Sequence, residues 1–270
     1  MKALLVSRID NRDALAFTDK IRALLEKDGN DVIFDRNTAL SFGTGGIPLS
    51  DVKADVAIVV GGDGTILRTI QQMECPVPVL GINWGGVGFL ADLEPSEALG
   101  FIKTLSSGFS VEERMRIALY KDGACLGTAL NEAMVVTTRP AKMLSIAIVI
   151  DGVVAEQFRA DGLLISTPTG STAYAMSAGG PIVDPQVQAF LLVPLAPYLL
   201  SSRPHIISSS RHLEIMLESI KPANLAIDGQ QIFELGKSGT IEIRRSEKPA
   251  LFVDVKRNFF EKVDRKLRKL

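Results

Sequence analysis

The chain has 270 residues, enough for one or two domains with a substantial hydrophobic core. Lysine and arginine total 30 against 31 aspartates and glutamates, so the net charge of −1 supplies no long-range field that would collect nucleic acid or an anionic membrane. Two cysteines without a CxxC pair, and only two histidines, argue against a disulfide framework and against a zinc site.

Targeting and membrane-spanning patterns are likewise missing from the sequence. A signal peptide needs an apolar stretch of about 7–15 residues, whereas only Ala-Leu-Leu-Val precedes Ser7. The longest apolar run, residues 189–200, contains two prolines and is shorter than the roughly 18 residues of a spanning helix. We therefore expect a cytoplasmic protein that binds neither membrane nor nucleic acid.

Short apolar runs alternate with helical periodicity over residues 1–95. Four of the runs have the length of buried strands, at 2–7, 31–34, 55–60 and 77–82. Residues 10–27 carry apolar side chains at helical spacing, with charges on the other face. This alternation predicts βαβ units around a parallel sheet, so we expect a Rossmann-like α/β domain at 1–95.

From residue 96 to residue 255 the pattern changes to mostly antiparallel β-structure, which we expect to be β-sandwich-like. Asp-Gly pairs at 122–123 and 151–152 separate strand-like runs, as is typical of hairpins. Residues 170–178 interrupt the β pattern. Further strand-like runs lie at 213–217, 223–227, 240–244 and 251–255.

The tail, residues 256–270, is helical in pattern, and we expect it to pack back on the first domain. It is rich in lysine and arginine, including Lys262 and Lys266. Cations near the end of a helix usually interact with the helix dipole on a solvated face. We interpret them in that way rather than as a contact for nucleic acid or membrane.

The sharpest local feature is the segment 59–70, where a buried strand-like run ends in Gly-Gly-Asp-Gly and a helix-like stretch follows. Glycines permit a left-handed backbone and let a ligand approach bare amides, and successive amides at a helix start can cradle phosphate. Asp63 would repel phosphate, so it needs a separate reason, such as accepting a hydroxyl proton or holding a metal. The alternative is a tight turn in which Asp63 is the helix N-cap.

Other nucleotide-binding signatures fail. No GxxxxGK[ST] sequence occurs, which argues against a Walker-type NTPase. The segment 43–48 lacks both the third glycine of a dinucleotide fingerprint and a clear preceding strand, so we interpret it as a flexible loop.

Two further glycine clusters also follow strand-like runs. The segment 81–90 is expected to leave the same sheet edge as the first cluster, with Phe89 either a buried anchor or a stacking surface for a base. The segment 158–174 ends in a hydroxyl-rich turn, whose side chains serve either a polar ligand or capping and turn formation. Asn131 and Glu132 interrupt an apolar strand-like run, and they need partners if they are buried.

Together these segments resemble the NAD kinase family. The family's GGDG hallmark stands at 61–64, its asparagine–glutamate pair at 131–132 and its GINxGxxGFL stretch at 81–90. The long ADGxxxSTPTGSTAYxxSAGGP signature reads from 160 to 181 with almost no departure. This block is far more specific than GGDG, which diacylglycerol kinases and, more loosely, phosphofructokinases share.

The resemblance implies transfer of the γ-phosphoryl group of ATP, with Mg²⁺ or another divalent cation, to the 2′-hydroxyl of the adenosine ribose of NAD, forming NADP. It also implies an α/β first domain, a β-rich second domain that supplies much of the NAD site, and a homo-oligomer, either a dimer or a tetramer. Asp63 then resembles the general base, with no residue assigned as a protein metal ligand.

Other site residues follow from the same resemblance. Asn131 and Glu132 are similar to ribose ligands, Asp161 to a contact for a polar edge of NAD, and residues 172–177 to the adenine and nicotinamide pocket. The candidate nucleotide-binding residues are Gly61, Gly62, Gly64, Arg68, Phe89, Asn131, Glu132, Lys142, Arg159, Asp161, Thr172, Ala173, Tyr174, Ser177 and Gln230, with Gln231 as the alternative to Gln230.

Two other functions stay open. A lipid or sugar kinase could use the same GGDG loop, but it leaves the hydroxyl-rich segment 166–174 unexplained. A non-catalytic dinucleotide-binding module would make Asp63 only a cap, and Asp63→Asn would then retain full function.

Overall fold

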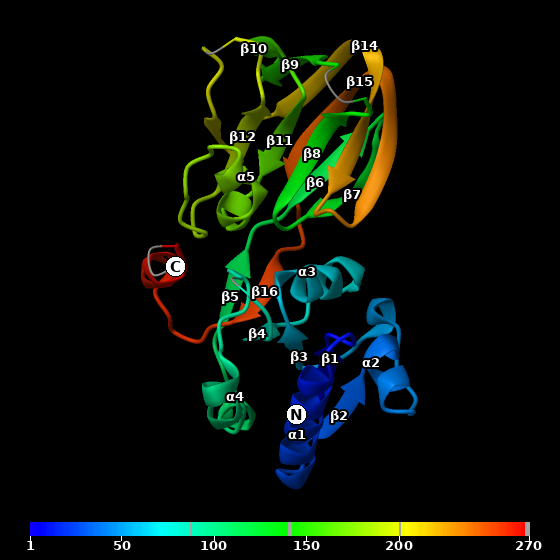
Figure 1. Ribbon diagram of the computed structural model, residues 1–270, viewed down its shortest axis with the longest axis vertical. Coiled ribbons are helices and arrows are strands. Elements are labelled where there is room, and N and C mark those ends of the chain that lie inside the picture. The colour runs from blue at the N-terminus through cyan, green and yellow to red at the C-terminus, as the bar shows by residue number, and fades with distance from the viewer. Residues whose placement is uncertain (87, 140–141, 200, 268–270) are drawn as a thin grey trace. The chain divides into compact units, whose positions relative to one another are not determined.

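The computed structural model describes residues 1–86, 88–139, 142–199 and 201–267. The chain divides into two compact units (Figure 1). Unit 1 comprises Met1–Glu113 together with Ala250–Leu270, and unit 2 comprises Arg114–Pro249. Each unit is described by itself.

Unit 1 is built on a largely parallel sheet flanked by helices (Figure 1). Among the described residues the sheet has six strands in the order β2-β1-β3-β4-β16-β5. The strands are β1 (Lys2–Ser7), β2 (Asp31–Phe34), β3 (Val56–Gly61), β4 (Val79–Asn83), β5 (Val111–Arg114) and β16 (Ala250–Val253). The helices are α1 (Arg12–Lys27), α2 (Arg36–Ser41), α3 (Asp63–Gln72), α4 (Pro95–Ile102) and α6 (Phe259–Leu267).

Local sequence explains the first elements of this unit. Asn11 caps α1 by accepting a hydrogen bond from the amide of Ala14 at 2.9 Å. The apolar stripe of α1, which includes Ile21, packs against buried strands such as β3, whose six residues are all buried. Helix α1 contacts β1, β2 and β3, α3 contacts β3 and β4, and α4 contacts both β4 and α1.

The extent of unit 1 differs from the boundary expected at residues 95 and 96. Helix α4 and strand β5 lie beyond that boundary, and β5 borders β16 in the first sheet. The strand expected at 251–255 forms as β16, but it pairs in parallel with β4 rather than with strands of unit 2. Long-range pairing of this kind leaves no mark in local periodicity.

Unit 2 is a β-rich unit whose pairings are antiparallel (Figure 1). Its described residues form a ten-stranded sheet with the main order β13-β12-β11-β8-β14-β15-β6-β7, and β9 pairs with both β10 and β14. The strands are β6 (Ile117–Lys121), β7 (Ala124–Ala129), β8 (Glu132–Thr137), β9 (Leu144–Ile150), β10 (Val153–Ala160), β11 (Gly162–Ser166), β12 (Ala189–Leu195), β13 (His205–Ser208), β14 (Leu213–Ile227) and β15 (Gln231–Arg245). The expected fold class, an α/β first part and a β-rich second part, is confirmed.

Several details of unit 2 depart from local sequence patterns. The runs at 213–217 and 223–227 form one strand, β14, which pairs antiparallel with β15 and has register shifts in that pairing near residues 218–224. The apolar run at 189–200 supplies β12, and β13 forms from a segment without a strand pattern. The interruption near 170–178 contains a 3-10 turn, η3 (Thr169–Thr172), and the short helix α5 (Tyr174–Ser177).

Candidate functional site

The glycine loops of unit 1 leave the sheet at the carboxyl ends of neighbouring strands. β3 lies between β1 and β4, and the strand order reverses direction between β1 and β3. The 61–64 loop follows β3, and the 81–90 segment begins in β4. Ligands of open α/β sheets bind beyond the carboxyl ends of the strands at such a reversal. The position of the GGDG loop therefore agrees with a nucleotide site.

Asp63 is the first residue of α3, and Gly62 is the N-cap. The alternative in which Asp63 caps its own helix is therefore wrong. Its carboxylate instead accepts the amide of Phe89 at 2.6 Å and the amide of Leu90 at 2.9 Å. A Cβ at Gly88 would lie 2.6 Å from Asp63 Oδ1, so only glycine allows this close approach. The second glycine cluster thus fixes the direction of the Asp63 side chain.

The other candidate residues in unit 1 either lie within five residues of Asp63 in the sequence or, like Phe89, contact its carboxylate. Gly61, Gly62 and Gly64 do not use the left-handed backbone that glycine permits. Space is open around the Cα atoms of Gly62 and Gly64, where a ligand could approach the backbone. Arg68, on the next turn of α3, has a buried Nε without a hydrogen-bond partner among the described residues. Phe89 is half-buried.

Unit 2 holds Asn131 and Glu132 where β8 begins. Asn131 is buried, and its carbonyl accepts the amide of Thr167 at 2.9 Å and the hydroxyl of Ser166 at 3.0 Å. A Cβ at Gly170 would lie 2.1 Å from the same carbonyl, which explains the glycine there. The hydroxyl-rich segment therefore packs directly on the asparagine–glutamate pair, and part of it serves structure.

Asp228 orders the backbone of that pair. Its buried carboxylate accepts the amides of Leu130 at 2.7 Å, Asn131 at 2.8 Å and Glu132 at 3.0 Å. The amide of Asp228 donates to the carbonyl of Glu132 in return, at 2.9 Å. Asp228 has a φ of 46°, a left-handed value that aspartate and asparagine tolerate better than most residues.

The surroundings of Glu132 disfavour the charged form of its carboxyl group. Burial, and secondly the negative charge of Asp228, raise the pKa of Glu132 to about 7. Its Oε2 is buried without a hydrogen-bond partner among the described residues. An acceptor in this state is suited to a ligand hydroxyl, whose donated hydrogen bond would stabilise the charged form.

The remaining candidates near this end of β8 differ in exposure. Thr172 is buried, whereas Tyr174 is 47% exposed and Ser177 is exposed, and Ala173 joins η3 to α5. Both glutamines of the turn after β14, Gln230 and Gln231, are exposed, so burial does not choose between them.

Three predicted residues lie together at the opposite end of these strands. Asp161 precedes β11, Arg159 pairs with β9, and Lys142 lies just before β9. β11 runs from Gly162 to Ser166, so roughly 16 Å of strand separates Asp161 from the Glu132 end. Unit 2 therefore divides its candidate residues into two groups.

Sequence reasoning missed two contributions. No site role is predicted for Asp228 from the sequence, yet its buried carboxylate accepts hydrogen bonds from the amides of residues 130–132. The cations of the tail were interpreted as solvated dipole partners, but Lys262 is only 6% exposed and pairs with Asp92. The spacing of Lys262 and Lys266, one helical turn apart on the same face, was the available signal.

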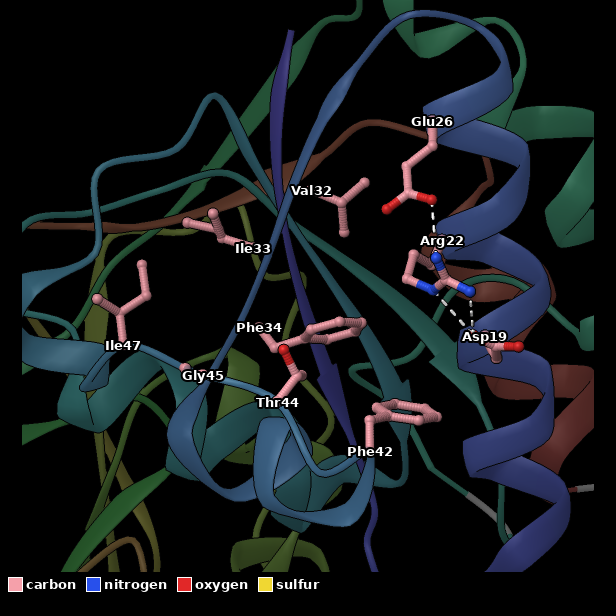
Figure 2. Close-up of a pocket in the computed structure, with 11 residues that line it drawn as sticks. Asp19, Arg22, Glu26, Val32, Ile33, Phe34, Phe42, Thr44, Gly45 and Ile47 are labelled. Atoms are coloured by element: carbon pink, nitrogen blue, oxygen red, sulfur yellow. Dashed lines mark hydrogen bonds and ion pairs between the residues drawn. The ribbon is translucent and has the colours of Figure 1, made fainter.

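A separate cavity of about 570 Å³ lies between α1, β2 and the 42–47 loop (Figure 2). Arg22 in its wall already pairs with Asp19 at 2.8 Å and with Glu26 at 2.8 Å. The rings of Phe34 and Phe42 lie 5.2 Å apart beside it. None of the predicted nucleotide-binding residues lines this cavity, and its cation is already neutralised.

The part of the chain that the structure describes contains neither a cluster of metal-binding side chains nor a membrane-spanning helix. Within it, no group of three or more His, Cys, Asp or Glu side chains is arranged to hold a metal ion. Across the same residues, every helix is too short or too polar to pass through a bilayer.

Two family models match the chain. The ATP-NAD kinase N-terminal domain matches residues 6–108, and the ATP-NAD kinase C-terminal domain matches residues 130–255. The chain belongs to the NAD kinase family. The NAD kinase of Methanoregula boonei is 61% identical and that of Methanoculleus marisnigri is 59% identical, each over 270 residues with both chains covered completely.

Solved structures agree with this membership in the NAD kinase family. The crystal structure of an NAD kinase from Archaeoglobus fulgidus in complex with ATP aligns with a TM-score of 0.83 and 31% identity, and the alignment covers both chains completely. Yeast NADH kinase complexed with NADH aligns with a TM-score of 0.89 and 25% identity, covering 100% of this chain and 88% of that one. The resemblance to NAD kinases is confirmed, and the chain is an ATP-dependent phosphotransferase of this family.

Proposed function

We propose that the chain transfers the γ-phosphoryl group of ATP to the 2′-hydroxyl of the adenosine ribose of NAD, with Asp63 as the general base. The observation that carries this assignment is the Asp63 carboxylate at the reversal of strand order, fixed by two backbone amides. Two amides use only part of its accepting capacity, because an ionised carboxylate has about four lone-pair sites. The remainder can accept a hydroxyl proton.

Phosphoryl transfer to a ribose hydroxyl requires a general base. A ribose hydroxyl is a weak nucleophile, and a positioned base that removes its proton during attack typically contributes about 10²–10⁴ in rate. Attack forms a bond between the 2′-oxygen and the γ-phosphorus, and the bond from that phosphorus to the bridging oxygen of ADP breaks. The hydroxyl proton passes to Asp63.

Several groups of unit 1 suit the phosphates of ATP. The open backbone at Gly62 and Gly64 and the first amides of α3 suit phosphate oxygens. The Nε of Arg68, which has no hydrogen-bond partner among the described residues, suits the same anion.

A divalent cation fits this site only in company with the nucleotide. The described residues offer no cluster of three carboxylate, His or Cys ligands, and Mg²⁺ commonly binds one or two carboxylates plus substrate phosphates. Such a cation would neutralise charge on the transferring phosphoryl group.

Unit 2 carries the residues proposed to contact NAD. The Oε2 atom of Glu132 lacks a hydrogen-bond partner among the described residues. We propose that it accepts a hydrogen bond from a ribose hydroxyl of NAD, with the buried Asn131 beside it as a second ribose ligand. Thr172, Ala173, Tyr174 and Ser177 are proposed to line the base pocket next to it, with Gln230 or Gln231 at its rim. Lys142, Arg159 and Asp161, at the other end of the strands, are proposed to contact a different part of NAD.

Two properties of the whole protein complete the proposal. We expect a homo-oligomer, either a dimer or a tetramer, and a cytoplasmic location. Size-exclusion chromatography with light scattering measures the first, and a monomer at micromolar concentration would contradict it.

One assay tests the proposed reaction. Purified protein is incubated with ATP, Mg²⁺ and NAD, and NADP is measured through an NADP-specific dehydrogenase. The proposal expects NADP to accumulate in step with ADP. Folded protein that makes no NADP, or that consumes ATP only with a lipid or sugar acceptor, would reject it.

A further inference from the structure

The C-terminal helix α6 carries two lysines that contact the loop holding Asp63. Lys262, 6% exposed, donates a hydrogen bond to the carbonyl of Phe89 and pairs with Asp92. Lys266, one helical turn later, donates to the carbonyl of Gly88, and its Nζ lies 5.8 Å from the centre of the Phe89 ring. Burying an ammonium group is costly unless it is paired, so these contacts have a specific role.

The lysines and Asp63 hold the same two peptide units from opposite sides. In a trans peptide the C=O and N–H bonds point in opposite directions. The unit between Gly88 and Phe89 accepts a hydrogen bond from Lys266 at its oxygen, and its N–H donates to Asp63. The next unit accepts a hydrogen bond from Lys262 at its oxygen, and its N–H likewise donates to Asp63.

Each of these peptide units therefore lies between a cation and an anion. Hydrogen bonds in such a chain polarise and strengthen one another. Burial, and then the positive charge of Lys262, lower the pKa of Lys266, while Asp63, Glu94 and Asp92 oppose that shift. The charge of Lys266 thus interacts with the Asp63 carboxylate as well as with the peptide between them.

We propose that Lys262 and Lys266 are positioning residues, whose ammonium groups hold the two peptide units that orient the Asp63 carboxylate. The link to catalysis rests on the proposed role of Asp63 as general base. Without the ammonium groups, the carbonyls of Gly88 and Phe89 lose their partners and both peptide units can rotate. Asp63 would then sample directions that do not face the 2′-hydroxyl.

The test compares methionine and arginine variants of each lysine in the full-length protein. Lys266→Met is the principal variant because Lys266 is only half-buried, and Lys262→Met is the second. Lys266→Arg and Lys262→Arg keep the charge. The matched control is Arg265→Met, which removes a cation from an exposed position on the same helix.

Two quantities are measured for each variant. Amide hydrogen exchange at Phe89 and Leu90 reports on the peptide units without any reference to activity. Steady-state kinetics with ATP, Mg²⁺ and NAD give kcat and the two KM values. Correct folding is checked by the emission of Trp84, the single tryptophan, whose ring lies 5.0 Å from that of Phe17.

Loss of a hydrogen bond from a charged donor predicts about tenfold faster exchange at Phe89 in Lys266→Met and at Leu90 in Lys262→Met. It also predicts kcat reduced about tenfold, with both KM values within about threefold. The arginine variants should recover most of both losses, and Arg265→Met should match the wild type.

Unchanged exchange in the methionine variants would overturn the proposal, and so would faster exchange with an unchanged kcat. If the wild-type protein makes no NADP, the proposed function fails on its own. The exchange measurement would then still decide whether the two lysines hold the loop.

Discussion

Both units contain a carboxylate that follows a strand and accepts hydrogen bonds from the amides of a distant segment, but the two carboxylates have different charged neighbours. In unit 1, Asp63 accepts two amides, and Lys266 stands behind one of the peptide units. In unit 2, Asp228 accepts hydrogen bonds from three amides and also interacts with the charge of the buried Arg116, while burial and then the charge of Asp228 raise the pKa of Glu132 to about 7.

The difference teaches how each unit treats its ligand. Under the proposed function Asp63 works beside phosphates, and the two lysines near it are proposed to keep the direction of its carboxylate fixed. In unit 2 the pair of neighbouring carboxyls favours a neutral, hydrogen-bonding ligand such as a ribose hydroxyl. Asp228 is thus a structural carboxylate, whereas we assign Asp63 a chemical role.

Removing the Asp228 carboxylate should have the largest effect on stability. Asp228→Ala leaves three buried amides without their acceptor and puts alanine at a left-handed φ. We expect a loss of about 3–5 kcal/mol in the free energy of unfolding, measured by urea denaturation. Asp228→Asn keeps an acceptor and the φ preference, so it should lose clearly less. Equal losses in the two variants would contradict the role of the amide contacts.

Glu132→Gln should stabilise the protein, and only at neutral or alkaline pH. The Glu132 carboxyl takes up its proton near pH 7 when folded but near pH 4.5 when unfolded, so folded protein binds more protons between these values. Wild-type stability therefore falls as pH rises through this window, by about 2–3 kcal/mol. Thermal melting at pH 5 and pH 8 measures it.

The control for this pH dependence is Glu234→Gln, at an exposed position of β15. It should melt like the wild type at both pH values. An advantage of Glu132→Gln that is equal at pH 5 and pH 8 would show that the raised pKa is not its cause.

Gly88→Ala sharpens the comparison on the side of unit 1. The added methyl group would lie 2.6 Å from Asp63 Oδ1, and the flexible end of that side chain must give way. We expect kcat to fall about tenfold with little change in melting temperature, because a displaced base costs rate rather than folding. Gly86→Ala, whose added methyl group would meet no described atom within 4 Å beyond its chain neighbours, should behave like the wild type. Equal kcat in both variants would contradict the close approach.

Local sequence patterns predicted much of the fold but few of the long-range hydrogen-bond partners of the site residues. The buried run before GGDG and the Asp-Gly turns predicted the parallel and antiparallel halves, because those patterns are set by nearby residues. The partners of Asp63 lie 26 and 27 residues away, that of Leu130 lies 98 residues away, and that of Lys262 lies 173 residues away. Such contacts depend on topology, which explains why the roles of Asp228 and Lys262 escaped prediction.

Site residues show the same limit. The resemblance assigns Asn131 and Glu132 to a ribose and Asp161 to a polar edge of NAD, but it does not say how far apart they lie, and β8 and β11 carry them at opposite strand ends. The sequence singles out Asp63 as a carboxylate that phosphate binding alone does not explain, and its role as a base stays a prediction. Its exclusion as an N-cap required the structure, since aspartate before a helical run is a common cap.

The kcat of Asp63→Asn tests the central claim most directly. The variant keeps an oxygen that can accept an amide, but it cannot take the hydroxyl proton. The account predicts that kcat for NADP formation falls by about 10²–10⁴ at saturating ATP and NAD, while the KM for NAD stays within about threefold. Turnover close to that of the wild type would contradict it and would reassign Asp63 to a structural role.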